Sequence, residues 1–122
     1  MSSEIIITSP NSAKEGATVQ FSIAIRNTWS TPQVFHMECW APDQSFKNEL
    51  FDVVDSIDAG ATKAWPPATF KMPDYDAEIF VWLERWSGSD YIYENASLKK
   101  VSLSAELVPE FANFGVTEYS RA

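Results

Sequence analysis

The sequence from residue 18 to residue 27 reads TVQFSIAIRN and carries the clearest structural signal in the chain. Its apolar residues alternate with polar or small ones, and successive side chains of a β-strand point to opposite faces. The pattern therefore predicts a strand that is buried on one face. The residues expected on that face are Val19, Phe21, Ile23 and Ile25.

On either side of this stretch, turn residues divide the chain into further short strands. These are expected near residues 5–7, 33–41, 50–57, 62–70 with a break at Pro66-Pro67, 77–86, and 91–103 beyond a hairpin loop at residues 87–90. The stretch 77–86 is apolar on both faces, because Ile79, Val81 and Leu83 alternate with Phe80 and Trp82. Such a strand is covered on both sides or binds a partner.

About seven short strands without a sustained helical period predict an all-β fold, an immunoglobulin-like Greek-key β-sandwich. A small barrel is the alternative. We expect residues 1–104 to form the sandwich and residues 105–122 to form a hydrophobic C-terminal tail. In that tail, Leu107, Phe111 and Phe114 have helical spacing up to Gly115, and a short extended pattern follows through Val116 and Tyr119.

Composition narrows the classes of function. A chain of 122 residues suits one domain, and its formal net charge of −8 argues against nucleic acid as a partner. One cysteine excludes an intramolecular disulfide, so the core must hold by packing. The N-terminus has no signal-peptide pattern, and no apolar run approaches the roughly 18 residues of a membrane span, so the chain as given reads as soluble and unexported.

No catalytic, cofactor or metal site is expected. His36 and Cys39 are three residues apart on a predicted strand, which places them on opposite faces and argues against a nucleophile and base pair. We interpret Cys39 as a packed thiol and His36 as a histidine at the rim. Asp74 and Asp76, with Asp55 or Asp58, lack the spacing of a calcium loop and read as solvated turn residues.

The aromatic residues exceed what a core needs, because five tryptophans contribute to an aromatic content of 14%. We expect Trp40 and Trp65 in the core, and Trp82 and Trp86 in a covered interface. The interface residues we predict are Phe80, Trp82, Trp86, Leu107, Phe111, Phe114, Val116 and Tyr119. The alternative is a sugar-binding platform made of Trp86, Tyr91 and Tyr93.

Three motifs carry a resemblance to a known family. They are the run AKEGATVQFSIAIRNT at residues 13–28, IDAGAT at residues 57–62, and FKMPDYDAEI at residues 70–79. They resemble the cell-adhesion-related (CARDB-type) immunoglobulin-like domains of bacteria and archaea, in which a glycine starts the second strand, an asparagine ends it, and an Ala-Gly turn opens a later strand. The likeness covers roughly residues 4–103.

The resemblance implies a non-catalytic sandwich that serves as a surface, adhesion, spacer or virion module. The acidic, asparagine-rich strand of the family is reduced here to Glu94-Asn95-Ala96, and the tail from Ser104 has no counterpart in the motif. Our leading hypothesis is a structural or adhesion module that self-assembles as a homo-oligomer or larger assembly at an extracellular surface or in a virion. A carbohydrate-binding module is the alternative, and an enzyme comes last.

Overall fold

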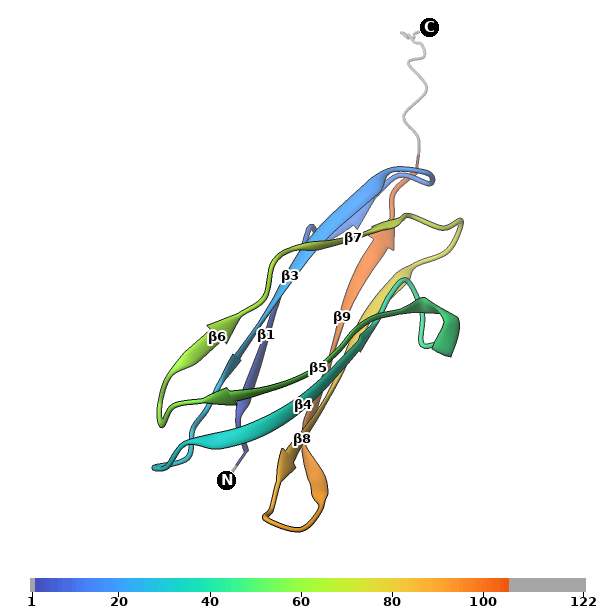
Figure 1. Ribbon diagram of the computed structural model, residues 1–122. Coiled ribbons are helices and arrows are strands. Elements are labelled where there is room, and N and C mark those ends of the chain that lie inside the picture. The colour runs from blue at the N-terminus through green and yellow to red at the C-terminus, as the bar shows by residue number, and fades with distance from the viewer. Residues whose placement is uncertain (1, 106–122) are drawn as a thin grey trace, which may run out of the picture.

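The computed structural model describes residues 2–105, and two β-sheets pack face to face in it (Figure 1). The first sheet contains β1 (Glu4–Thr8), β3 (Thr18–Arg26), β6 (Thr62–Ala64) and β7 (Ala68–Lys71). The second has the order β2 (Ser12–Ala13), β9 (Tyr91–Leu103), β8 (Ala77–Trp86), β4 (Gln33–Trp40) and β5 (Glu49–Ile57). A short 3-10 helix, η1 (Phe46–Asn48), precedes β5. The predicted immunoglobulin-like β-sandwich is confirmed.

The alternation of apolar with polar or small residues along β3 places the core as predicted. Strand β3 buries its four large apolar residues, and β8 buries Ala77, Ile79, Val81 and Leu83 from the opposite sheet. Strand β4 adds Phe35, Met37 and Cys39 to this core. All of these side chains are almost completely inaccessible to solvent, so packing of the two sheets is the main source of stability.

One sequence prediction about the core needs correction. Trp40 does not belong to the core, because β4 turns Cys39 inward and Trp40 outward, where it is half-buried beside Phe80. Trp65, by contrast, packs against the core as expected. Strand β9 runs without a break from Tyr91 to Leu103, as expected, and contains a bulge that faces Leu83 and Glu84 on β8.

The residues of the three family-like motifs have clear backbone roles. Gly16 and Gly60 in these motifs have positive φ angles of 83° and 72°, a backbone conformation that residues with a side chain rarely adopt. The side chain of Asn27 is fully buried at the end of β3, and its Nδ2 donates to the carbonyl oxygens of Ile57 and Thr31 at 2.9 and 3.0 Å. This asparagine therefore ties the end of β3 to two loops.

The first residues of the chain run parallel to β9, an arrangement that the sequence did not predict. The Ser3 carbonyl accepts a hydrogen bond from Asn95 Nδ2 at 2.8 Å, and Ser9 Oγ accepts one from Lys99 Nζ at 2.9 Å. Further along, β2 pairs with the end of β9, where Ser12 lies opposite Ser102. The N-terminal segment is thus held at several points along one long strand.

The C-terminal tail predicted from residue 105, including its helix at residues 105–115, lies outside the described residues apart from Ala105. Strand β9 ends at Leu103, close to the predicted boundary of the sandwich.

Among residues 2–105, no helix has the length and apolar character that a membrane span requires.

Candidate functional site

The outer face of the five-stranded sheet gathers several aromatic residues that lie outside the core. We call it the aromatic face, and its members come from β4, β8 and β9. They are the aromatic residues Trp40, Phe80, Trp82, Trp86, Tyr91 and Tyr93, together with Leu98. The register places them together, since Trp40 lies opposite Phe80, and Trp86 lies opposite Tyr91.

The predicted interface residues of the sandwich, Phe80, Trp82 and Trp86, all lie on this face. The predicted sugar-binding residues Tyr91 and Tyr93 join Trp86 there. The rest of the predicted interface belongs to the tail and lies outside the described residues: Leu107, Phe111, Phe114, Val116 and Tyr119.

The rings of the aromatic face pack against one another in pairs. The ring centroids of Trp82 and Tyr93 are 4.9 Å apart, and so are those of Trp86 and Tyr91, with tilted or edge-on geometry. These are favourable arrangements for aromatic pairs. Trp86 is still 40% exposed and Tyr93 58% exposed, so a considerable apolar area faces solvent.

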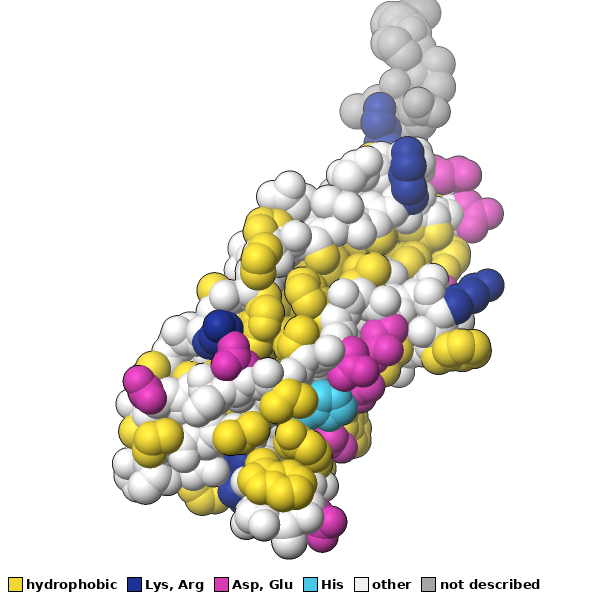
Figure 2. Space-filling view, viewed as in Figure 1, with side chains coloured by type: hydrophobic (Ala, Val, Ile, Leu, Met, Phe, Trp, Pro, Cys, Tyr) yellow, Lys and Arg dark blue, Asp and Glu magenta, His cyan; other side chains and the backbone are white. Residues whose placement is uncertain are grey.

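A charged cluster lies beside these rings, and His36 is at its centre. His36 Nε2 is 2.6 Å from Asp52 Oδ1 on β5, and His36 Nδ1 is 2.9 Å from Glu84 Oε1 on β8. Glu38 lies on the same face of β4, directly opposite Asp52. Figure 2 shows the histidine against a group of acidic side chains, with hydrophobic side chains on its other side. His36 is therefore not a rim residue, contrary to the sequence interpretation.

The carboxylates around His36 favour its charged form. Burial works to lower its pKa, but hydrogen bonds to Glu84 and Asp52 and the nearby charge of Glu38 outweigh burial, so the pKa of His36 is raised above 6.5. The same hydrogen bond from His36 lowers the pKa of Glu84 despite its desolvation. Burial and a hydrogen bond with Glu49 raise the pKa of Glu38.

The imidazolium of His36 makes stability depend on pH. A raised pKa means that its contribution is fully present below the unfolded-state pKa of about 6.5 and is lost as pH rises through the folded-state value. We expect His36→Gln to lower the free energy of unfolding by about 1 kcal/mol at pH 6 and by less at pH 9. Urea unfolding at both pH values measures this difference, and a penalty that is equal at both would contradict it.

Within residues 2–105, Cys39 and His36 do not form a nucleophile and base pair with each other. Cys39 is fully buried, and burial raises the pKa of its thiol to about 12, so the thiolate is not accessible at neutral pH. Its side chain points into the core, whereas His36 points outward. The two do not meet, as strand alternation predicted.

Side chains that can bind a metal ion lie close together at a place other than the aspartates considered from the sequence. Asp55 pairs with Lys63 at 2.7 Å, and Asp76 accepts the backbone N–H of Leu103 at 2.8 Å, so these aspartates stabilise the fold. Within residues 2–105, one group has suitable donors close together. His36, Glu38 and Asp52 each offer a ligand atom, and these atoms lie within 4.8 Å of one another.

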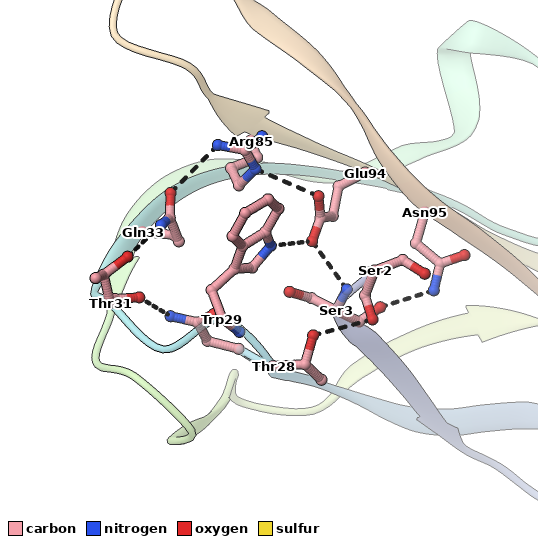
Figure 3. Close-up of polar contacts among 10 residues, drawn as sticks. Ser2, Ser3, Thr28, Trp29, Thr31, Gln33, Arg85, Glu94 and Asn95 are labelled. Atoms are coloured by element: carbon pink, nitrogen blue, oxygen red, sulfur yellow. Dashed lines mark hydrogen bonds and ion pairs between the residues drawn. The ribbon is translucent and has the colours of Figure 1, made fainter.

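A second polar cluster, centred on Glu94, ties the N-terminus to the sandwich (Figure 3). Oε2 of Glu94 accepts hydrogen bonds from the Ser3 backbone N–H and from Trp29 Nε1, both at 2.8 Å. Arg85 lies over the Trp29 ring, with its guanidinium carbon 4.1 Å from the ring centroid. Arg85 Nε is 3.4 Å from Glu94 Oε1 as an ion pair, although its N–H is not aligned to donate a hydrogen bond.

The Glu94 cluster is structural in character. Burial would raise the pKa of Glu94, but its donors from Trp29 and Ser3 and the charge of Arg85 lower it overall. The bulge in β9 turns this carboxylate inward, and alternation of residue types along the strand gave no sign of it. Sequence reasoning therefore missed both Glu94 and the partners of His36.

Comparisons with known proteins identify the fold. The chain is similar to the CARDB domain of a protein from Pyrococcus furiosus, whose crystal structure is in complex with di-metal ions. The identity is 8%, the match covers 84% of this chain and 87% of that chain, and the TM-score is 0.59. The expected CARDB-like fold is thus confirmed. At this identity, the similarity concerns the fold alone.

Two glycosidases match with lower similarity. A β-glucosidase from Listeria innocua shares 12% identity, with 87% of this chain and 16% of that chain covered and a TM-score of 0.45. A β-glucuronidase from Bacteroides uniformis shares 16% identity, with 81% and 13% covered and the same TM-score. This chain thus spans a small part of either enzyme. Neither the protein-family models nor the curated proteins include a match.

Proposed function

We propose that this domain is a non-catalytic structural or adhesion module that assembles with copies of itself through the aromatic face. The observation that supports the proposal best is the group of partly exposed rings that β4, β8 and β9 bring to one face of the sheet. Exposed apolar patches of this kind mark sites of association, and tryptophan and tyrosine dominate the energetics of protein interfaces.

The occupant that we propose for this face is the C-terminal segment of a neighbouring copy. That segment supplies Leu107, Phe111, Phe114, Val116 and Tyr119, whose apolar side chains complement the rings. Fully extended, residues 106–122 reach roughly 55 Å. Strand β9 measures roughly 43 Å, so the segment is long enough to cover the face. Two aromatic faces packed directly together would instead bring their acidic clusters into contact, which disfavours that symmetric arrangement.

The test compares the size of three proteins in solution. We expect the mass of the full chain in solution to be well above the 13.7 kDa of the monomer. Deletion of residues 107–122, or the double change Trp86→Ser and Tyr93→Ser, should yield monomers. The matched control is Phe46→Ser, because Phe46 is 87% exposed on η1 and is not a member of the aromatic face. Analytical ultracentrifugation measures the masses.

Three outcomes would overturn the proposal. Oligomers that survive both changes would show that neither the tail nor the face mediates association. A full chain that is monomeric at high concentration would exclude self-assembly. A deletion variant that fails to fold would assign the tail to its own core.

A carbohydrate-binding module remains the second candidate, because Trp86, Tyr91 and Tyr93 are partly exposed near the hairpin loop. Aromatic rings with polar groups at their border are suited to stacking on sugars. Against this, the rings of Trp86 and Tyr91 meet edge to face and do not form one flat platform. This second function would be favoured if polysaccharide gels retard the full chain but do not retard the double variant Trp86→Ser and Tyr93→Ser.

A further inference from the structure

The structure assigns a divalent transition-metal site to His36, Glu38 and Asp52 on the outer face of the five-stranded sheet. We propose that it takes Zn²⁺ or a similar ion, independently of the assembly function. The three donors lie on two adjacent strands, β4 and β5, and their ligand atoms lie within 4.8 Å of one another. Rigid neighbouring strands are a suitable support for such a site.

The donor set determines the class of metal. An imidazole nitrogen with two carboxylate oxygens suits zinc and related ions, whereas Ca²⁺ needs six to eight oxygen ligands. Zinc binds imidazole nitrogen and carboxylate oxygen at about 2.0–2.2 Å, so neighbouring ligand atoms of a tetrahedral site stand roughly 3.3 Å apart. His36 Nε2 and Asp52 Oδ1, now 2.6 Å apart, need to separate slightly to admit the ion.

Glu84 supplies the feature that distinguishes this group from a chance cluster of acids. It holds the Nδ1 side of the imidazole at 2.9 Å and so fixes the ring with Nε2 directed at Asp52. Metal-bound histidines almost always donate their second ring N–H to such an acceptor. When a metal binds, Nε2 loses its proton to solvent and coordinates the ion, while Nδ1–H continues to donate to Glu84.

The charge balance around His36 also favours a cation. Glu38 and Asp52 are directly opposite each other, and like charges in that position destabilise a sheet. Glu49 and Glu84 add two further carboxyl groups next to them. Within residues 2–105, His36 is the sole basic side chain that forms an ion pair with any of these four groups. A divalent ion would neutralise the excess negative charge of these carboxyl groups.

The site is partly open, which makes it accessible to an ion from solution. The side chain of His36 is half-buried among its neighbours, whereas that of Asp52 is 58% exposed. Three protein ligands leave at least one coordination position for water, as in other zinc sites with an open position.

The experiment uses the full chain and its single histidine, whose imidazole signals need no assignment by mutation. We expect ZnCl₂ to shift the imidazole ¹H and ¹⁵N resonances with a stoichiometry of one ion per chain, and CaCl₂ to leave them unchanged. Isothermal titration with ZnCl₂ then ranks the variants. His36→Ala should abolish binding, and Glu84→Gln should weaken it about 10–100-fold.

The matched control is Asp55→Asn, because Asp55 is on the same strand as Asp52 but pairs with Lys63 across the edge. It should bind Zn²⁺ as the parent does. Asp52→Asn, at a more exposed position, serves as a second ligand variant if His36→Ala does not fold. Imidazole resonances unmoved by millimolar Zn²⁺, or affinity unchanged in both ligand variants, would overturn the assignment. Analytical ultracentrifugation of the Zn²⁺-loaded chain measures its oligomeric state separately from metal binding. A failure of the metal site can therefore be told apart from a failure of the assembly proposal.

Discussion

Replacing Phe21 with alanine is expected to lower the free energy of unfolding by about 3–5 kcal/mol, the usual cost of removing a buried phenylalanine. Phe21 is 1% exposed in the middle of β3, and its ring centroid is 6.0 Å from that of Phe70. Because the ring is enclosed by the two sheets and has almost no contact with solvent, replacing it with alanine leaves a cavity between them. Urea denaturation of both proteins measures the difference.

The control for this change is Ile6→Ala on the neighbouring strand β1, where Ile6 is 43% exposed. Because nearly half of the Ile6 surface already faces water, we expect a penalty of about 1 kcal/mol or less. A Phe21→Ala protein that melts within a degree or two of the parent would mean that β3 turns its other face to the core.

The second large effect is expected at Glu94. Glu94→Ala removes the acceptor of Ser3 N–H and Trp29 Nε1–H and leaves Arg85 without its carboxylate. The side chain of Glu94 is only 4% exposed, and breaking a buried charge pair costs about 3–5 kcal/mol. Chemical unfolding at pH 7 measures this loss.

Glu94→Gln is the matched control, because glutamine keeps the shape and one acceptor oxygen but not the charge. Its penalty should be smaller than that of alanine. The pKa of Glu94 is lowered in the fold, so the contribution of its charge is present above the unfolded value of about 4.5 and is lost as pH falls through the folded value. Equal stability of the parent and both variants at pH 7 would show that the cluster contributes nothing.

The sequence was sufficient to predict the fold because its strongest signals are local. Alternation along β3 and β8 is a property of single strands, and the turn residues Gly16 and Gly60 adopt the left-handed backbone that glycine allows. The same alternation placed His36 and Cys39 on opposite faces. These predictions required no knowledge of which strands are neighbours.

The candidate sites required that knowledge, and the sequence did not contain it in readable form. His36 meets Asp52 and Glu84 through the register of β4 with β5 and β8, over separations of 16 and 48 residues. Trp40 is expected in the core from the sequence, but the alternation of β4 turns it outward with His36 and Glu38. Glu94 depends on a bulge that has no pattern in the sequence.

The parallel run of the first residues beside β9 has a mechanical consequence. The chain enters the domain near Ser3 and leaves the described part at Ala105, at opposite ends of the long axis (Figure 1). A force that pulls these two points apart would load the contacts between the N-terminal segment and β9 in shear, so that they resist together and do not open one at a time. Such contacts extend from Ser3 at Glu94 to Ala13 at Ser104. Under tension, the folded domain would therefore transmit force along its length. The lifetime of the folded state under that force would be set by the barrier to unfolding.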